Sequence, residues 1–149
     1  MVIYTDGSSR GNPGPGGWGA VAIDDDGKFL WAYGRQYDRN VTNNAMELEA
    51  IIWAYEMYSS ATIYSDSSYS VNTLTNWVFG WKANGWIKSD KKVPKNLDLL
   101  KVYCNLFDLI GKIDLRHCKG HADNQWNNLA DAIATGKMTP EAVNEQYKQ

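Results

Sequence analysis

The hydrophobic pattern of the chain changes near residue 44 from that of strands to that of a helix, and this change limits the fold more than any other feature. Before it, three apolar runs predict strands at residues 2–6, 18–23 and 29–37. A Gly- and Pro-rich stretch over 7–17 predicts a long turn after the first strand, and the acidic run 24–27 predicts a hairpin turn after the second. The three strands are therefore expected to form an antiparallel meander.

Beyond this point helices alternate with short strands. Apolar residues at helical spacing predict a helix over 44–59: Leu48, Ile51, Ile52, Tyr55 and Tyr58. A strand over 61–65 follows without room for a hairpin, so we predict a crossover and parallel pairing. The other predicted elements are helices near 67–80, 95–111 and 126–134, the last stopped by Gly136, and a strand over 113–117. The pattern predicts an α/β protein with three antiparallel strands and then parallel crossovers.

Four carboxylates lie where a predicted strand or helix meets a loop: Asp6, Glu47, Asp66 and Asp131. Asp6 and Asp66 end the two strands expected to be central neighbours, and ligands of such sheets bind at the carboxyl ends of the strands. Glu47, expected in the first turn of its helix, can lean over the same edge. Four acids this close cannot all stay ionised without cations. Two divalent metals, the machinery of phosphodiester cleavage, are therefore the predicted occupants.

Each acid also has a structural explanation, and at this point these alternatives stay open. Asp6 suits a turn, and Glu47 suits a capping box that begins at Asn44. Asp66 suits a helix N-cap, and Asp131 suits an ordinary solvent-facing helical position. Taken singly, each acid fits the structural explanation better. Taken together, the predicted topology favours a shared site because it sends at least three of the acids to one end of one sheet.

Two further motifs are weaker. The Gly-rich stretch 11–17 lacks the Gly-Lys-Ser/Thr ending of a P-loop, so no nucleotide cofactor is expected; it fits a close approach of a nucleic-acid backbone or a purely structural turn. His117, Cys118 and His121 raise the alternative of zinc, with Cys104 the only other soft ligand, but closed zinc sites usually have four ligands at recognisable spacing. His121 fits a proton shuttle or an aid to product release on a Gly-containing loop, or a solvated histidine without a role.

The charge of the chain is unevenly distributed. The net charge is −2, yet residues 82–101 carry six lysines against two aspartates, a local balance of +4 that leaves −6 for the rest. Trp77, Trp81 and Trp86 lie in or beside this basic segment. Aromatic residues among lysines suit stacking and backbone contacts on nucleic acid. The alternative is a solvated loop whose tryptophans pack into the core.

Length and composition favour one soluble domain. A chain of 149 residues with 44% hydrophobic and 21% charged residues is typical of a folded globular protein. No apolar run approaches the roughly 20 residues that span a bilayer, and Asp6 and Arg10 interrupt the region where a signal peptide would lie. Met1 immediately before the first strand favours a free-standing protein. Two cysteines suit reduced thiols, so we expect a cytoplasmic location and no membrane partner.

Six motifs together resemble the type 1 ribonuclease H family. They are YTDGS at 4–8, GNPGPGG at 11–17, TNNAMEL at 42–48, YSDS at 64–67, KGHA at 119–122 and NNLAD at 127–131. The resemblance implies a ribonuclease H-like five-stranded mixed sheet flanked by helices. It covers a catalytic domain over 1–137 with a basic protrusion at about 81–101, and leaves a polar, loosely ordered tail at 138–149.

The resemblance implies endonucleolytic hydrolysis of the RNA strand of an RNA–DNA hybrid, leaving 3′-hydroxyl and 5′-phosphate ends. Asp6 is then expected to bridge two Mg²⁺ ions, for which Mn²⁺ can substitute. Asp131 is expected to help hold the ion that activates water, and Glu47 and Asp66 the ion at the leaving oxygen. His121 corresponds to the family's mobile histidine. We expect a monomer.

The resemblance also assigns the substrate contacts. Residues expected near the RNA 2′-hydroxyls are Asn12, Asn43, Asn44 and Ser68. For the DNA strand they are Thr42 and Asn96 as a phosphate pocket and Trp77 as a sugar-stacking wall. Trp81 and Lys82, at the start of the basic protrusion, are expected to grip the hybrid.

Some positions depart from the family pattern. Asn40 and Ala45 stand where relatives carry arginines near phosphates, and Ser68 replaces a glutamine. Arg39 is a candidate to compensate for Asn40. Two rival interpretations remain: a non-catalytic hybrid-binding module, which would ordinarily have lost an acid, and a metal-dependent exonuclease or recombination nuclease with a related sheet.

Overall fold

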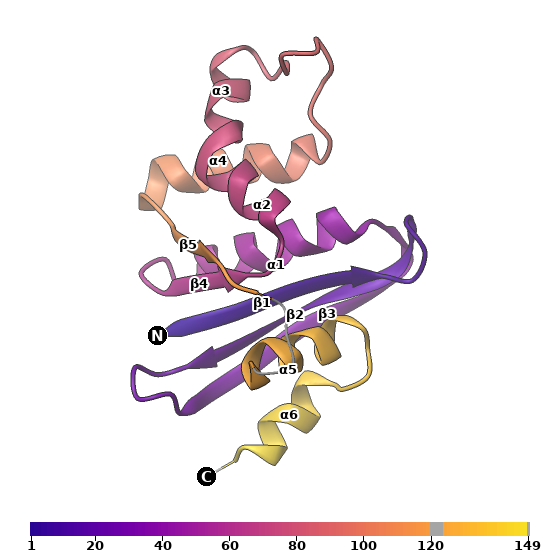
Figure 1. Ribbon diagram of the computed structural model, residues 1–149, viewed down its shortest axis with the longest axis vertical. Coiled ribbons are helices and arrows are strands. Elements are labelled where there is room, and N and C mark those ends of the chain that lie inside the picture. Colours follow the sequence, from indigo (N-terminus) through magenta and orange to yellow (C-terminus); the bar gives the residue numbers. More distant parts are fainter. Residues whose placement is uncertain (120–123, 149) are drawn as a thin grey trace.

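A computed structural model describes residues 1–119 and 124–148 and contains a five-stranded sheet between two groups of helices (Figure 1). The strands are β1 (Val2–Ser9), β2 (Gly14–Ile23), β3 (Phe29–Val41), β4 (Thr62–Ser65) and β5 (Asp114–His117). Their order is β3-β2-β1-β4-β5. β1, β2 and β3 pair antiparallel, whereas β4 pairs parallel with both β1 and β5. The predicted meander and parallel pairing are confirmed.

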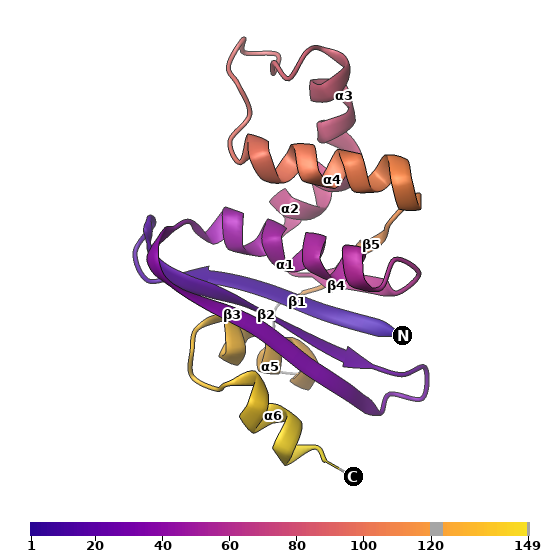
Figure 2. The ribbon, with the colours of Figure 1, turned by 180° about the vertical axis from the view of Figure 1, so that it is seen from behind.

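Helices cover both faces of the sheet (Figures 1 and 2). One face carries α1 (Asn43–Met57), and the other carries α5 (Gln125–Ala134) and α6 (Pro140–Gln146). The predicted helix near 67–80 is a helical run made of α2 (Ser68–Asn72), a π-helical turn (Thr73–Trp77) and α3 (Val78–Ala83). This run and α4 (Leu97–Ile110) lie on the α1 side. None of the helices in the described parts of the chain combines the length and the apolar character needed to span a membrane.

Apolar side chains fill the space on both sides of the sheet. The cluster on the α1 side includes Ile3, Trp18, Leu48, Ile51, Leu74 and Leu100. The smaller cluster, on the α5 and α6 side, consists of Val21, Ala32, Ala130, Ile133 and Val143. β2 contributes to both clusters because its successive side chains point to opposite faces. This explains why β2 is apolar throughout rather than alternating.

The long turn predicted over 7–17 is wrong. β1 continues to Ser9 and β2 begins at Gly14, so only residues 10–13 form the tip of the hairpin. Glycine allows this pairing: a Cβ on Gly16 would lie 2.2 Å from the carbonyl oxygen of Ser8. The longer β2 also gives β3 a partner beyond residue 37, as far as the pair formed by Gly14 and Val41. Glycine here serves close strand approach and not a turn.

The loosely ordered tail predicted over 138–149 is also wrong for the described residues. Thr139 caps α6 by accepting a hydrogen bond from the Ala142 N–H at 3.1 Å. Val143 is fully buried against the sheet. The Asn144 side chain accepts from the Ala32 N–H and donates to the Ala32 carbonyl, at 2.8 and 3.0 Å. The tail therefore covers part of β3, which is an edge strand.

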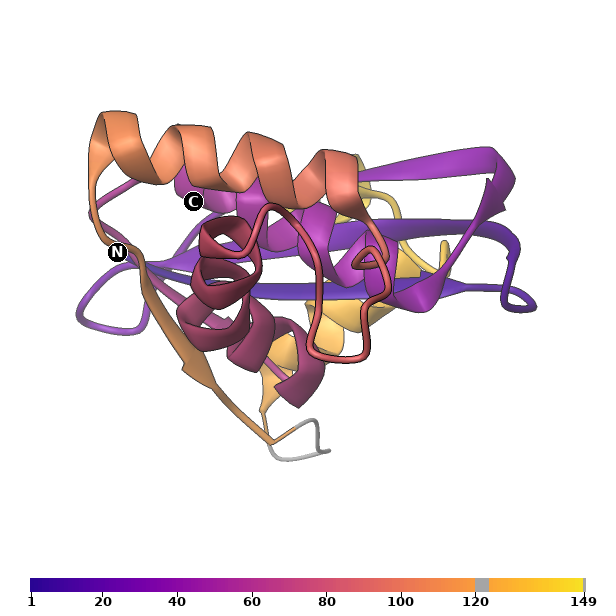
Figure 3. The same ribbon diagram turned by 90° about the horizontal axis from the view of Figure 1, so that it is seen from above.

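The basic segment lies far from the sheet. α3 and the chain that follows it project beyond α4 (Figure 1). Viewed from above, the chain between α3 and α4 forms an open loop beside α3 (Figure 3). Trp81 and Trp86 are half-buried and pack against the larger core cluster, whereas Trp77 is 42% exposed. Trp81 and Trp86 therefore pack against the core, as one interpretation predicts, whereas Trp77 is exposed, as stacking on nucleic acid requires.

Candidate active site

The four carboxylates meet at one edge of the sheet. Asp6, Glu47 and Asp66 each offer an oxygen, and these oxygens all lie within 4.8 Å of one another. Asp131 lies next to them, near enough to Asp6 to raise the pKa of that carboxyl group. Asp6 and Glu47 are 5% and 8% exposed, while Asp66 is half-buried and Asp131 exposed. The acid cluster is thus closed at its base and open on the side of Asp66 and Asp131.

The sheet register places two of these acids side by side. The parallel pairing of β1 with β4 ends at Thr5 and Ser65, and Asp6 and Asp66 are the next residue on each strand. The prediction that Asp6 ends its strand needs correction, because β1 runs on to Ser9 along β2. Asp6 nevertheless lies where the parallel part of the sheet ends, and this is the position that a ligand at the sheet edge requires.

The N-caps of α1 and α2 are not the residues that the capping explanations require, so the carboxylates of Glu47 and Asp66 are not used in capping. Thr42, not Asn44, caps α1 by accepting from the Ala45 N–H at 3.1 Å. Glu47 therefore lies in the second turn of α1 rather than the first. Ser67, not Asp66, caps α2 by accepting from the Ser70 N–H at 3.1 Å. The two capping explanations for these carboxylates are thus wrong.

Gly7 allows α1 to approach the acid cluster. A Cβ at this position would lie 2.3 Å from the backbone nitrogen of Glu47 and 2.4 Å from the carbonyl carbon of Met46. The Gly7 backbone is also near enough to the Glu47 carboxylate to lower its pKa in part. The local pattern around this glycine predicts only a turn beside Asp6 and reveals no contact with a helix forty residues away in the chain.

Burial and mutual repulsion disfavour the charged forms of the two inner acids. Burial raises the pKa of Asp6, and the neighbouring Glu47, Asp131 and Asp66 raise it further. Burial likewise raises the pKa of Glu47, although hydrogen bonds with Asp6 and from Gly7 oppose that shift. A nearby cation would relieve both effects because it stabilises the ionised carboxylates.

The donor set of the acid cluster fits hard divalent cations. Its ligand atoms are carboxylate oxygens, which Mg²⁺ and Mn²⁺ prefer. The Oε2 atom of Glu47 is buried and accepts no hydrogen bond from any described residue. A buried carboxylate oxygen without a partner is costly unless a cation binds it.

Zinc has no comparable support. Among residues 1–119 and 124–148, the acid cluster is the one group of three or more candidate ligands found within coordinating reach. Cys104 is buried on α4, and the His117 Nε2 atom lies 3.2 Å from the carbonyl oxygen of Asp66. His121 lies outside the described residues, so its predicted role as a proton shuttle stays a prediction.

Cys118 borders the acid cluster, and sequence analysis considered it only for zinc. Burial, followed by the charges of Asp66, Asp6 and Glu47, raises the pKa of its thiol to about 11. The position of Cys118 could have been predicted from the pattern of strands. Residues 5, 65 and 117 form one row across β1, β4 and β5, so residues 6, 66 and 118 follow at the same edge.

The residues predicted to contact RNA lie at the tip of the β1–β2 hairpin and at the starts of α1 and α2. Asn12 accepts a hydrogen bond from the Asn43 N–H at 3.1 Å, and Asn43 accepts one from the Ser9 N–H at 2.7 Å. These bonds hold the tip of the β1–β2 hairpin against the start of α1. Asn44 and Ser68 are exposed, and Ser68 begins α2 two residues after Asp66. Contact with RNA stays a prediction for all of them.

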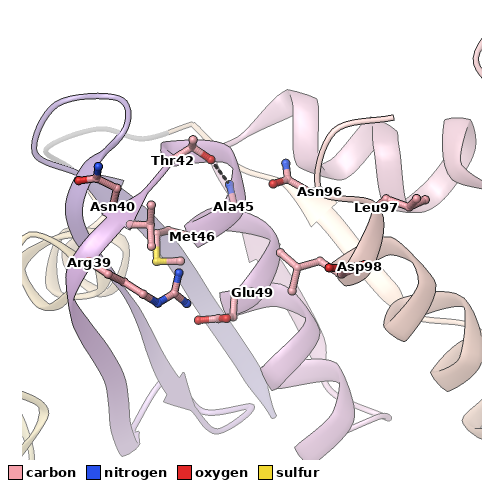
Figure 4. A pocket seen from close by; sticks show the side chains of 11 residues that line it. Arg39, Asn40, Thr42, Ala45, Met46, Glu49, Asn96, Leu97 and Asp98 are labelled. Atoms are coloured by element: carbon pink, nitrogen blue, oxygen red, sulfur yellow. Dashed lines mark hydrogen bonds between the residues drawn. The ribbon is translucent and has the colours of Figure 1, made fainter. Parts of the chain in front are cut away.

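Thr42 and Asn96 line a shared pocket of about 480 Å³ between the start of α1 and the start of α4 (Figure 4). Asn40 and Arg39 line the same pocket, and the Arg39 guanidinium points toward Glu49 across it. Asn96 has a left-handed backbone conformation, with a φ of 60°. The structure thus places the two predicted phosphate contacts together.

The other predicted contacts with the hybrid differ in how free they are to bind a ligand. Trp77 and Trp81 have ring centroids 6.3 Å apart and line a hollow of about 410 Å³ along α3. Lys82, in contrast, forms an ion pair of 3.2 Å with Asp108 on α4. The Lys82 side chain is 44% exposed and can still reach a ligand, but its ion-pair partner lies within the protein.

The similarity to known proteins extends over the whole sheet and all four acids of the cluster. The RNase H family profile matches residues 1–139. Ribonuclease H of Anaplasma marginale (strain St. Maries) is 43% identical over 141 residues, which cover 93% of this chain and 90% of that protein. The PFV RNase H domain superposes with a TM-score of 0.76 at 25% identity, over 89% of this chain and 90% of that one. LC11-RNase H1, solved in complex with an RNA/DNA hybrid, gives a TM-score of 0.66 at 25% identity, over 95% and 98%.

Proposed function

The chain belongs to the ribonuclease H family and hydrolyses the RNA strand of RNA–DNA hybrids, and we propose that it does so with two divalent cations held by Asp6, Glu47, Asp66 and Asp131. The observation that supports this most directly is the acid cluster, in which oxygens of three carboxylates lie within 4.8 Å of one another and the fourth acid, Asp131, is near enough to Asp6 to raise its pKa. A binding module without activity would not need these four acids.

The resemblance to the family gives each carboxylate a role. When bound, the two cations supply an activated water, charge stabilisation at the leaving oxygen, and alignment for in-line displacement. Asp6 would be shared between the two ions. Asp131 would help to hold the ion that activates water, and Glu47 and Asp66 would hold the ion that stabilises the leaving oxygen. The products are then 3′-hydroxyl and 5′-phosphate ends, and His121 accelerates the reaction.

Selectivity follows from contacts on either side of the acid cluster. Asn12, Asn43, Asn44 and Ser68 read the RNA 2′-hydroxyls next to the reacting phosphate, a group that DNA lacks. The DNA strand lies in the pocket of Thr42 and Asn96 and along two tryptophans, Trp77 at the end of the π-helical turn and Trp81 in α3. Because lysines and arginines supply much of this affinity, binding weakens as salt rises.

Three finer points belong to the same proposal. Mg²⁺ is the physiological ion, because an all-oxygen, hard ligand set suits it. The chain acts as a monomer, because every acid of the cluster comes from one chain. It works in the cytoplasm, where thiols such as its two free cysteines stay reduced.

A cleavage assay tests the proposal. A duplex of labelled RNA with DNA is incubated with the protein and 5 mM Mg²⁺ or Mn²⁺, and the products are sized beside single-stranded RNA and duplex DNA of the same sequence. We expect internal cuts in the RNA strand of the hybrid only, and none in EDTA. Intact RNA in the presence of either ion would refute the proposed function, and trimming from one end only would favour an exonuclease.

Gly7→Ala is expected to lower both stability and turnover. The added methyl group would overlap the backbone of Met46 and Glu47, so α1 must shift away from β1. Overpacking of this kind costs about 1–3 kcal/mol of unfolding free energy, and a displacement of about 1 Å at a site can cost about 100-fold in rate. Urea unfolding and hybrid cleavage measure the two effects.

Gly80→Ala provides the control for the unfolding measurement. Gly80 lies in α3, and a Cβ there meets nothing within 4 Å. Alanine should therefore stabilise the helix by about 0.5–1 kcal/mol. Equal unfolding free energies for Gly7→Ala and the wild type would show that α1 does not need this close approach.

A further inference from the structure

One face of β3 carries tyrosines and arginines in alternation: Tyr33, Arg35, Tyr37 and Arg39. We call these four residues the β3 ladder. The face is the one that bears α1, because the Tyr33 ring stacks on Trp53 of that helix with centroids 4.9 Å apart. The Tyr37 hydroxyl donates a hydrogen bond of 2.6 Å to Glu49 on the same helix. Alternation along the strand brings the arginines to this face as well.

The tyrosines hold the arginines in place and leave their charge available. The guanidinium carbon of Arg39 lies 4.7 Å from the centroid of the Tyr37 ring. Arg35 lies between Tyr33 and Tyr37 on the same face of the strand. Both arginines are exposed, and neither forms an ion pair with any residue that the structure describes. Guanidinium groups held in this way are suited to bind phosphates through paired hydrogen bonds.

The β3 ladder continues from the pocket of Thr42 and Asn96. Arg39 is a member of both, since it lines that pocket (Figure 4). Arg35 lies four residues back along the strand, a distance of about 13 Å at roughly 3.3 Å per residue. This distance corresponds to about four nucleotide steps of a duplex at roughly 3.4 Å per step. A nucleic-acid strand that leaves the pocket along β3 would therefore meet a second cation several nucleotides away.

We propose that the β3 ladder binds the phosphate backbone of the DNA strand where that strand extends beyond the pocket. The inference rests on the proposed function, because the pocket is taken to hold DNA. The overall charge of the chain is −2, so attraction to phosphate must come from local sites such as this one. Glu49, the acid nearest to Arg39 in the pocket, already accepts hydrogen bonds from Trp18 and Tyr37 at 2.7 and 2.6 Å. The tyrosines add flat surfaces on which sugars or unpaired bases can stack.

Binding to hybrids of two lengths tests this inference. One hybrid is a blunt duplex, and the other carries a single-stranded DNA extension of six nucleotides, placed in turn at either end of the DNA strand. Affinities are measured by fluorescence anisotropy in Ca²⁺ between 50 and 200 mM salt. We expect the wild type to bind one extended hybrid about threefold to tenfold more tightly than the blunt one, and Arg35→Ala to lose this gain. Arg35→Ala combined with Arg39→Ala should also reduce the salt slope by about two.

Matched variants separate a local contact from net charge. Lys28→Ala combined with Lys112→Ala removes two exposed cations outside the β3 ladder and should keep the gain from the extension. Arg35→Lys keeps the charge without the planar fork and should retain part of the gain. Equal losses for the lysine pair and the arginine pair, or no gain from either extension in the wild type, would overturn the inference. A wild type that binds neither hybrid would overturn the proposed function itself.

Discussion

Asp6→Asn is expected to lower hybrid turnover by about 1,000-fold or more while leaving hybrid binding within about twofold of the wild type. Asparagine keeps the size of the side chain and can still hydrogen-bond to Glu47 or Asp131, but it removes the negative charge that two cations would share. The substrate contacts proposed around the hairpin tip and the pocket do not involve this side chain. Turnover is measured by cleavage of a labelled hybrid in Mg²⁺, and binding by anisotropy in Ca²⁺.

A surface aspartate supplies the control for this variant. Asp26 is exposed in the turn between β2 and β3, and Asp26→Asn removes the same charge away from the acid cluster. Its turnover should equal that of the wild type. If Asp6→Asn loses binding together with turnover, Asp6 has a structural role. If Asp6→Asn keeps more than a tenth of the turnover, the shared-ligand role is wrong.

Mg²⁺ is expected to raise the melting temperature of the protein by about 5–10 °C at pH 8 and by much less at pH 5. At a concentration 100 times its dissociation constant, a ligand of the folded state adds about 2.7 kcal/mol, and 1 kcal/mol shifts a domain of this size by about 2–4 °C. The cation replaces the repulsion among the carboxylates with attraction. At low pH it must displace protons from the acids, so the stabilisation shrinks.

The pH dependence of the metal-free protein follows from the raised pKa values of Asp6 and Glu47. Unfolding returns both carboxyl groups to ordinary pKa values of about 4. Above that pH the folded state holds more protons than the unfolded state, so these two groups lower the free energy of unfolding as the pH rises. The loss continues until the pH passes the pKa of each group in the folded protein.

Thermal melts at several pH values, in EDTA and in Mg²⁺, check this pattern. Asp6→Asn relieves part of the repulsion, so without metal it should melt above the wild type at pH 8 and respond less to Mg²⁺. A wild type whose melting temperature is unchanged by Mg²⁺ at pH 8 would show that the acid cluster does not bind the ion tightly. An equal response in Asp6→Asn would place the ion elsewhere.

Much of the fold and of the acid cluster was predictable, because it depends on local patterns and on general rules of strand connection. The crossover rule predicted that the strands before Asp6 and Asp66 are neighbours, and their pairing confirms it. The stop at Gly136 is confirmed as well, since this residue has a φ of +80° just after α5. The strand pairing follows from a general rule of connection, and the helix stop follows from residues that are close in sequence.

The errors arose where distant segments meet. The glycines after residue 10 were assigned to a turn because their role, close approach of β2 to its neighbours, is visible only in the assembled sheet. The tail was assigned as loose because its sequence is polar. Its order comes from the burial of Val143 and from the hydrogen bonds between Asn144 and Ala32, more than a hundred residues away.

The kinds of element, their order, and the acids near strand ends can all be predicted from the chain, because hydrophobic period and turn chemistry act over a few residues. How close those acids come and how far they are buried depends on tertiary packing. Glu47 reaches Asp6 because Gly7 leaves room for the backbone of α1. The β3 ladder likewise forms only in the folded protein, where α1 packs against Tyr33 and Tyr37 and leaves the two arginines exposed. Burial and distance set the pKa of a carboxylate and its affinity for a cation, and both are properties of packing rather than of any short stretch of chain.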